Sequence, residues 1–276
     1  MSLLKRNLLA TALAGIVTIA SSAIQVKAQS IKSITAQKGC PGCNLLSGTF
    51  RELNISDANF EGTVFREADL KDSHLESANF KNSDLRRASL EKANFRTSDF
   101  TFAKMRGADL EKSDLAGSSF NEADLRDADF GESDLSGADS FGADLRDAFL
   151  RRATLDGANF NNVRMQHSDL ERATAEGTDF SDAQMTNSDF SRINAKSGIY
   201  KNADMTFSNL AHSDFSNADF SGTKLDNALM RATNFSGADL STASGILAEQ
   251  LAMACGDART KLPVGLTISK CDPVSQ

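Results

Sequence analysis

The sequence is poor in the residues that form irregular loops and catalytic sites. Its 276 residues include no Trp, one Tyr, three His and three Pro, whereas average usage of about 5 % would give roughly 14 Pro in a chain of this length. Because proline marks turns and irregular segments, its scarcity indicates a regular backbone. Three His and four Cys leave little material for a histidine-based metal site or a catalytic triad. We therefore expect no catalytic residues, no metal and no cofactor.

The N-terminal segment, residues 1–28, has the composition of a secretory signal peptide. Lys5 and Arg6 precede an uncharged apolar run over residues 8–20, which is too short to span a bilayer well. A Val-Lys-Ala sequence at 26–28 places branched and small residues at the −3 and −1 positions of a cleavage site before Gln29. An uncleaved N-terminal anchor is the alternative.

Cleavage would remove three basic residues and change the net charge from −7 to −10. No later apolar run approaches membrane-spanning length, so we expect no stable membrane insertion after cleavage. The sequence predicts an exported chain, periplasmic or secreted, or in the thylakoid lumen if the source is photosynthetic. An acidic, exported chain is also a poor candidate for binding nucleic acid.

A repeat with a period of five runs through most of the chain. Every fifth position from Leu45 to Leu240 is a centre, and 37 of the 40 centres are Leu, Phe, Met, Ile or Tyr; the exceptions are Ser140, Ala175 and Ala195. The residue two before a centre is nearly always small, and the residue directly before it is Asp 17 times and Asn nine times. This period fits neither an α-helix nor a long strand.

The pattern predicts a coil that turns a corner once in every repeat. The centre and the small residue would both point inward from one short extended segment, and the Asp or Asn between them can bond local backbone and support the bend. Half of the 14 Phe centres belong to a single set made of every fourth repeat, namely Phe60, Phe80, Phe100, Phe120, Phe160, Phe180 and Phe220. This indicates four-sided coils of four repeats each. With strands about 4.8 Å apart, ten coils would form a rod roughly 50 Å long.

The repeat resembles the motif A-(D/N)-L-x-x of the pentapeptide-repeat proteins. Ala58-Asn59-Phe60 and Ala68-Asp69-Leu70 are examples, and the resemblance covers residues 43–242 without an insertion. It implies a mainly β fold, a right-handed quadrilateral parallel β-helix of about ten coils. Parallel crossover connections favour the same hand.

The ends of such a solenoid expose unpaired backbone and must be covered. We interpret residues 29–42 as an N-terminal lead-in or cap, and 243–276 as a C-terminal cap helix and tail. A helix is predicted from the spacing of Leu247, Leu251, Ala254 and Cys255, with Gly256 as its stop. The tail resembles the C-terminal extension of exported family members.

Four cysteines in an exported chain predict two disulfides, for which three connectivities exist. We favour local pairing, Cys40 with Cys43 and Cys255 with Cys271. The alternative for the first pair is a thiol–disulfide redox site, but no thioredoxin-like βαβ pattern surrounds it.

The outward surface carries one regular charge pattern, which we call the arginine ladder. Its members follow every fourth centre, on one side of the predicted coil: Arg66, Arg86, Arg106, Arg126 and Arg146. Acidic residues lie beside it in sequence, namely Glu67, Asp84, Asp124, Asp127, Asp144 and Asp147. We expect a charge-compensated, solvated face; the alternative is a stripe that binds an anion or a protein partner.

The resemblance implies a non-enzymatic structural or protein-interaction module with an unidentified protein partner. Some cytosolic members of the family are acidic rods that mimic DNA and protect type II topoisomerases. The acidic balance fits that alternative, whereas the export signal and the arginine ladder oppose it. A thiol-redox protein that uses Cys40 and Cys43 is the other alternative.

Overall fold

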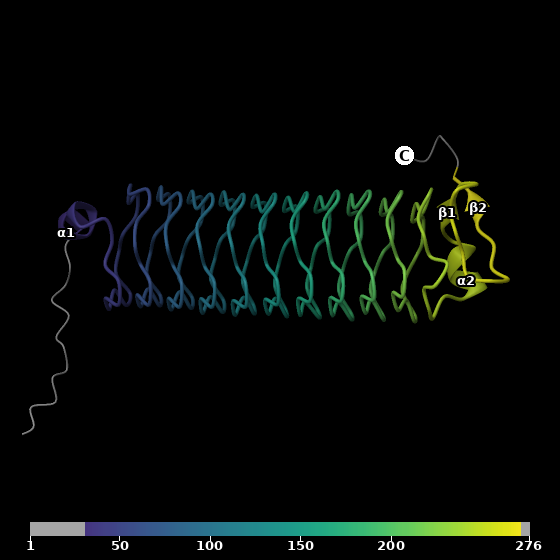
Figure 1. Cartoon of the computed structure of the whole chain (residues 1–276), viewed down its shortest axis with the longest axis horizontal. Helices are drawn as coiled ribbons and strands as arrows, with labels where there is room; N and C mark the ends of the chain where they lie inside the picture. The colour runs from purple at the N-terminus through teal and green to yellow at the C-terminus, as the bar shows by residue number, and fades with distance from the viewer. Residues whose placement is uncertain (1–30, 272–276) are drawn as a thin grey trace, which may run out of the picture.

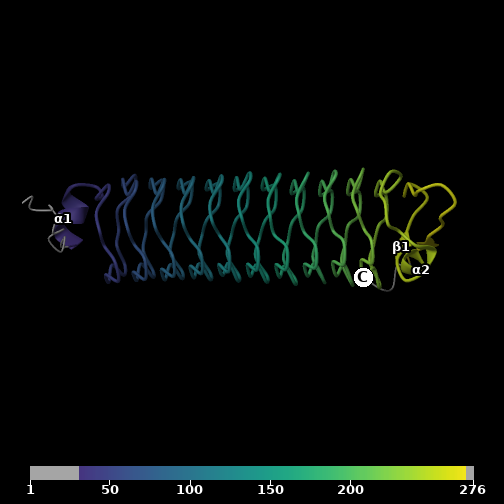
Figure 2. The ribbon, with the colours of Figure 1, turned by 90° about the horizontal axis from the view of Figure 1, so that it is seen from below.

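The computed structural model describes residues 31–271, which form an elongated rod of stacked coils (Figure 1). Helix α1 (Ile31–Ala36) lies at one end, and helix α2 (Ala248–Leu251) lies at the other with strands β1 (Cys255–Gly256) and β2 (Ser269–Lys270). A view turned by 90° shows the same rod with the helices at its ends (Figure 2). The predicted signal peptide lies outside the described residues. Neither described helix has the length and apolar character needed to cross a bilayer.

Parallel bridges join residues that are four repeats apart along the rod. They begin at Gly39↔Asn59 and recur once in every repeat to Lys224↔Ser244. Each coil therefore contains four repeats and four short extended segments, as the spacing of the Phe centres predicted. The coils begin slightly before residue 43, where the sequence pattern placed their start. Gly39 forms the first bridge, and the next residue, Cys40, occupies the position of a centre and is buried.

One repeat shows why the backbone adopts this coil. In the repeat that starts at Ala68, three amides donate to neighbouring coils: Asp69 to Gly48, Leu70 to Ser89 and Asp72 to Glu91. The amide of Ala68 closes the turn on Phe65, and the amide of Lys71 donates to the Asp69 carboxylate at 3.1 Å. All five amides have partners, as buried backbone requires. This confirms the predicted role of Asp and Asn before the centres.

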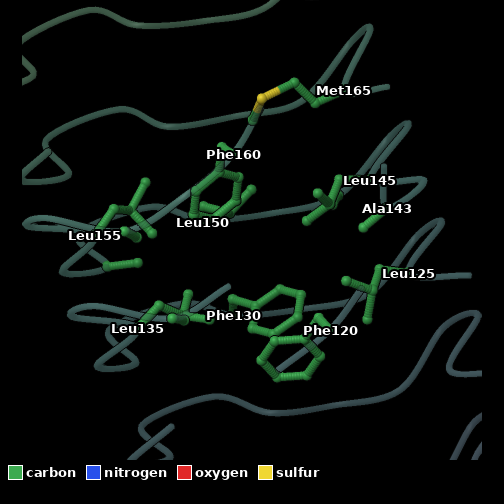
Figure 3. Packing of buried hydrophobic residues seen from close by; sticks show 14 of the residues in the cluster. Phe120, Leu125, Phe130, Leu135, Ala143, Leu145, Leu150, Leu155, Phe160 and Met165 are labelled. Carbon is green, nitrogen blue, oxygen red and sulfur yellow. The ribbon is translucent and has the colours of Figure 1, made fainter. Parts of the chain in front are cut away.

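The core is a column of inward side chains along the rod axis. Phe120 and Phe130 face each other across it within one coil, and Phe160 lies farther along the same column (Figure 3). Rings stack from coil to coil: the ring centroids of Phe100 and Phe120 are 5.0 Å apart, and the ring planes differ by 3°. Ser140 interrupts this stack, which resumes with Phe160 and Phe180. The prediction that the centres point inward is confirmed.

Ser and Thr at the small inward positions, Ser83 excepted, carry hydrogen bonds that the sequence pattern did not indicate. The hydroxyl of Ser113 donates to the Leu90 carbonyl at 2.7 Å, and that of Thr178 donates to the Leu155 carbonyl at 2.7 Å. Each bond joins one coil to the coil before it. A hydroxyl is therefore tolerated in the core where it is both small and paired with a carbonyl.

The C-terminal helix is shorter than the sequence predicts. The apolar spacing indicated a helix that reached Cys255, but α2 ends at Leu251 and Cys255 lies in β1. Leu251 is fully buried, and the side-chain amide of Gln250 donates to the carbonyls of Leu225 and Ala228. Helix α2 thus covers part of the last coil with a single turn.

Beyond α2 the chain resumes the coil pairing. The amide of Cys255 donates to the Thr233 carbonyl at 2.9 Å, and bridges join Asn234 to Cys255 and Asp239 to Lys261. The last coil presents free N–H and C=O groups, which an extended segment can satisfy and a helix, whose groups are paired internally, cannot. This is the reason the predicted helix ends early.

Candidate functional site

The rod surface carries a groove of about 710 Å³. It lies on the side of the rod whose centres are Leu45, Phe65, Leu85, Met105 and their equivalents up to Leu225, which we call the Leu/Met face. The groove is lined by Leu46, Arg66, Glu67, Arg86, Arg87, Arg106, Gly107 and Asp127. It therefore contains three members of the arginine ladder.

The coil geometry sets the positions of these arginines. Each ladder residue is the first residue of a turn, directly after a buried centre, so its side chain points to solvent. Arg87 and Asp127 are the second residues of their turns and have φ values of 56° and 57°. Successive coils are about 4.8 Å apart, so the guanidinium groups would repel one another unless acidic groups lay between them.

In the C-terminal half of the ladder that compensation is complete. Arg126 donates two hydrogen bonds to Asp124, at 2.7 and 2.8 Å, and Arg146 donates two to Asp144, at 2.8 and 2.7 Å. The bonds from Arg126 lower the pKa of the Asp124 carboxyl. Burial is the largest single influence and acts to raise the pKa of Asp144, but the bonds from Arg146 and the charges of Arg164 and Arg146 together outweigh it, so the pKa is lowered. These bidentate pairs are ionised at neutral pH.

The N-terminal half differs because two coils lack the acidic partner. Arg86 pairs with Asp84 at 2.7 and 2.6 Å, but the residues two before Arg66 and Arg106 are Val64 and Lys104. Arg106 bonds instead to Asp127 of the next coil, through a single contact of 2.8 Å. Within residues 31–271, neither Arg66 nor Lys104 forms a salt bridge or a side-chain hydrogen bond.

The charge count divides the ladder into two parts. On the Leu/Met face, the outward residues of 64–67, 84–87 and 104–107 include five basic and two acidic side chains, whereas those of 124–127 and 144–147 include two basic and four acidic. We call the five basic side chains the basic patch: Arg66, Arg86, Arg87, Lys104 and Arg106. The predicted compensated face is thus found only in the C-terminal half.

Sequence reasoning missed an aromatic side chain beside this patch. Phe102 is 56 % exposed and lies two residues before Lys104, at the corner of the rod. Fourteen of the 18 Phe are centres, so a Phe at a turn position is a departure that the repeat pattern itself could have revealed. Leu46, 45 % exposed, is part of the groove lining, whereas Phe102 lies outside it, in the turn before the Leu/Met segment of its coil.

The four cysteines lie in two local pairs, as predicted from their spacing, with the sulfur atoms at bonding distance. The Cα atoms are 5.5 Å apart for Cys40 and Cys43, and 4.8 Å apart for Cys255 and Cys271. Cys40 is 3 % exposed. No group of three or more His, Cys, Asp or Glu arranged to hold a metal ion occurs among the described residues.

Stacked coils of four repeats with a continuous inward column define a β-helical solenoid. A family model for pentapeptide repeats matches residues 43–139, 141–192 and 208–244, which is more than half of the chain. The chain therefore belongs to the pentapeptide-repeat family. A search of curated proteins found no match.

Several solved structures are similar to this chain. HetL of the cyanobacterium Nostoc sp. strain PCC 7120, involved in heterocyst differentiation regulation, is 22 % identical over 75 % of this chain and 89 % of its own, with a TM-score of 0.43. QnrB1, a plasmid-mediated fluoroquinolone resistance protein, is 19 % identical over 69 % and 90 %, with a TM-score of 0.32. A pentapeptide repeat protein from the Arabidopsis thaliana thylakoid lumen is 27 % identical over 38 % and 63 %, with a TM-score of 0.29.

Proposed function

We propose that the protein is a non-enzymatic, exported interaction module that binds a protein partner through the outward side chains of its rod. The observation that carries this proposal is the independence of surface and core. Every coil is held by inward side chains, backbone bonds and the Asp or Asn before its centres, so the exposed turn residues can differ from coil to coil while the coil is kept. Membership of a family of structural and interaction modules supports a binding role.

The test is capture of a partner by the purified protein. We expect a pull-down from the exported fraction of the source cells to retain a specific protein, and cross-linking to place that protein on one side of the rod. A matched bait in which the outward residues of that side are replaced should lose it. If the bait captures nothing that a bait of similar net charge does not also capture, the proposed function is wrong.

A second candidate, the DNA-mimic inhibitor, is favoured by one surface. On the side of the rod whose centres are Phe60, Phe80, Phe100 and their equivalents up to Leu240, the outward residues include eight acidic and two basic side chains. A topoisomerase partner requires the cytoplasm, so fractionation of the native protein separates this candidate from the first.

The proposed export also implies that both cysteine pairs are oxidised and structural. Thiol titration of the native protein should then detect no free thiols. Reversible titration of Cys40 and Cys43 at cellular redox potentials would instead support the redox alternative.

A further inference from the structure

We propose that the basic patch on the Leu/Met face binds an acidic peptide segment of a partner protein, with an apolar side chain of that segment packed on Phe102. This inference rests on the proposed function, since it names the surface and the chemistry of the partner. It limits recognition to the first half of the arginine ladder, where basic side chains outnumber acidic ones, and excludes Arg126 and Arg146, around which acidic side chains are in excess.

The charges of the patch are incompletely neutralised by the rest of the described chain. Arg66 and Lys104 form no salt bridge with any described residue, and Arg87 is 77 % exposed at 3.7 Å from Glu67. This local excess of positive charge occurs on a protein whose net charge is −7. Carboxylates of a partner would supply the missing counter-charges, and charge complementarity of this kind guides association and sets register.

Two exposed apolar side chains favour a peptide, Leu46 in the groove lining and Phe102 outside the groove, at the other corner of the Leu/Met face. Phe102 and Leu46 are about half exposed, and burying either against a partner would remove apolar area from water. Glu67 and Asp127 also line the groove. A continuous polyanion would meet these two carboxylates, whereas a short peptide can place its acidic residues between them.

The length of the patch sets the length of the peptide. Leu46 and Arg106, which both line the groove, are three coil spacings apart, about 14 Å along the rod at about 4.8 Å per coil. An extended peptide covers that distance with about four or five residues at about 3.3 Å each. It would cross the coil strands, whose amides are already paired, so side chains would carry the recognition and binding would weaken with salt.

The test is fluorescence anisotropy with a fluorescein-labelled Glu-Phe-Glu-Glu-Phe peptide. The first variant combines Arg66→Gln, Lys104→Gln and Arg106→Gln. The matched control combines Arg126→Gln, Arg146→Gln and Arg164→Gln, which removes the same charge from the same face. We expect the first variant to bind at least tenfold more weakly and the control to stay within threefold of the unmodified protein. Circular dichroism of both variants should show an intact rod.

The apolar contact is tested separately. Phe102→Ala should weaken binding severalfold, whereas Phe207→Ala should leave it unchanged, because Phe207 is equally exposed but lies far along the rod. Replacing both Phe of the peptide with Gly should reproduce the effect of Phe102→Ala. Raising the salt concentration about sixfold should weaken binding to the unmodified protein and to Phe102→Ala alike.

Four results would overturn the inference. Equal losses of peptide affinity in the two triple variants would mean that only the overall charge of the face matters. Binding of heparin with no binding of the peptide would assign the patch to a polyanion. A dimer that is detected by sedimentation and lost in the first variant would assign the basic patch to contact with a second copy of the chain. If a partner captured by pull-down is retained by the first triple variant, this inference is wrong but the proposed function stands.

Discussion

Tyr200 stacks on Phe220 with ring centroids 4.9 Å apart and planes 9° from parallel, and its hydroxyl is buried without a hydrogen-bond partner among the described residues. Burial raises the pKa of this phenol well above its ordinary value. Tyr200 is the only Tyr of the sequence and occupies a centre where the neighbouring coils carry Phe180 and Phe220. The ring packs as Phe does, whereas the hydroxyl is a buried polar group with an energetic cost.

We predict that Tyr200→Phe increases the free energy of unfolding by about 1 kcal/mol, because it removes an unpaired buried hydroxyl while it keeps the ring stack. The reverse change in the same stack, Phe220→Tyr, should lower stability by about 1–3 kcal/mol. Urea denaturation monitored by circular dichroism measures both. A loss of stability in Tyr200→Phe would show that the hydroxyl has a partner, such as a buried water.

The last repeat and the C-terminal segment are joined by an ion pair that predicts a pH dependence. Lys261 donates to Asp239 at 2.7 Å, and with bonds from Ser241 this lowers the pKa of the Asp239 carboxyl from its ordinary value of 3.8 to about 2. The native state thus binds this proton less tightly than the unfolded state. The stabilisation is fully present above pH 4 and is lost as the pH falls from about 4 to about 2.

Asp239→Asn should therefore lower stability by about 0.5–1 kcal/mol at pH 7, the range of a partly exposed pair, and have no effect near pH 2. Asp147→Asn is the matched control, since Asp147 forms no ion pair among the described residues. Thermal unfolding of the unmodified protein and both variants at a series of pH values measures the difference in stability. If Asp239→Asn lowers stability equally at both pH values, the ion pair is not the cause.

We predict that Leu125→Asp destabilises the rod by several kcal/mol. Leu125 is 1 % exposed and lies within the inward column (Figure 3), so the change buries a carboxylate with no cation in reach. Asn187→Asp, on the exposed surface of the same face, adds the same charge and should change stability by less than about 0.5 kcal/mol. Equal melting temperatures for the two variants would contradict the assigned register.

The pair Cys255–Cys271 should hold the C-terminal segment on the last coil. It closes a loop with a sequence separation of 16, for which a disulfide contributes about 3 kcal/mol. Cys255→Ser with Cys271→Ser should make residues 257–271 sensitive to protease while the coils stay resistant. Cys40→Ser with Cys43→Ser, whose separation is three, should have a smaller effect. Protease resistance of the first double variant would show that hydrogen bonds alone hold the segment.

Strict periodicity makes much of this fold predictable from sequence. A bridge in every repeat and a coil of four repeats both follow from the spacing of large and small residues, and the turn bonds follow from Asp and Asn before the centres. The C-terminal helix was predicted too long because spacing alone does not show that the last coil has unpaired backbone groups. Only the stacked structure shows that the backbone of Cys255 pairs with the last coil, which requires an extended conformation there.

The candidate site was half predictable. The sequence by itself determined that five arginines form a column, because the coil period fixes which residues lie above one another. Only the tertiary structure decided which of them are free. Asp124 and Asp144 lie two residues before Arg126 and Arg146, where the turn brings carboxylate and guanidinium into bidentate contact, while Val64 leaves Arg66 without such a partner. The structure shows that the turn brings the residue two before each arginine into reach of its guanidinium, and that Arg106 reaches Asp127 of the next coil; neither contact is apparent from the sequence without the turn geometry.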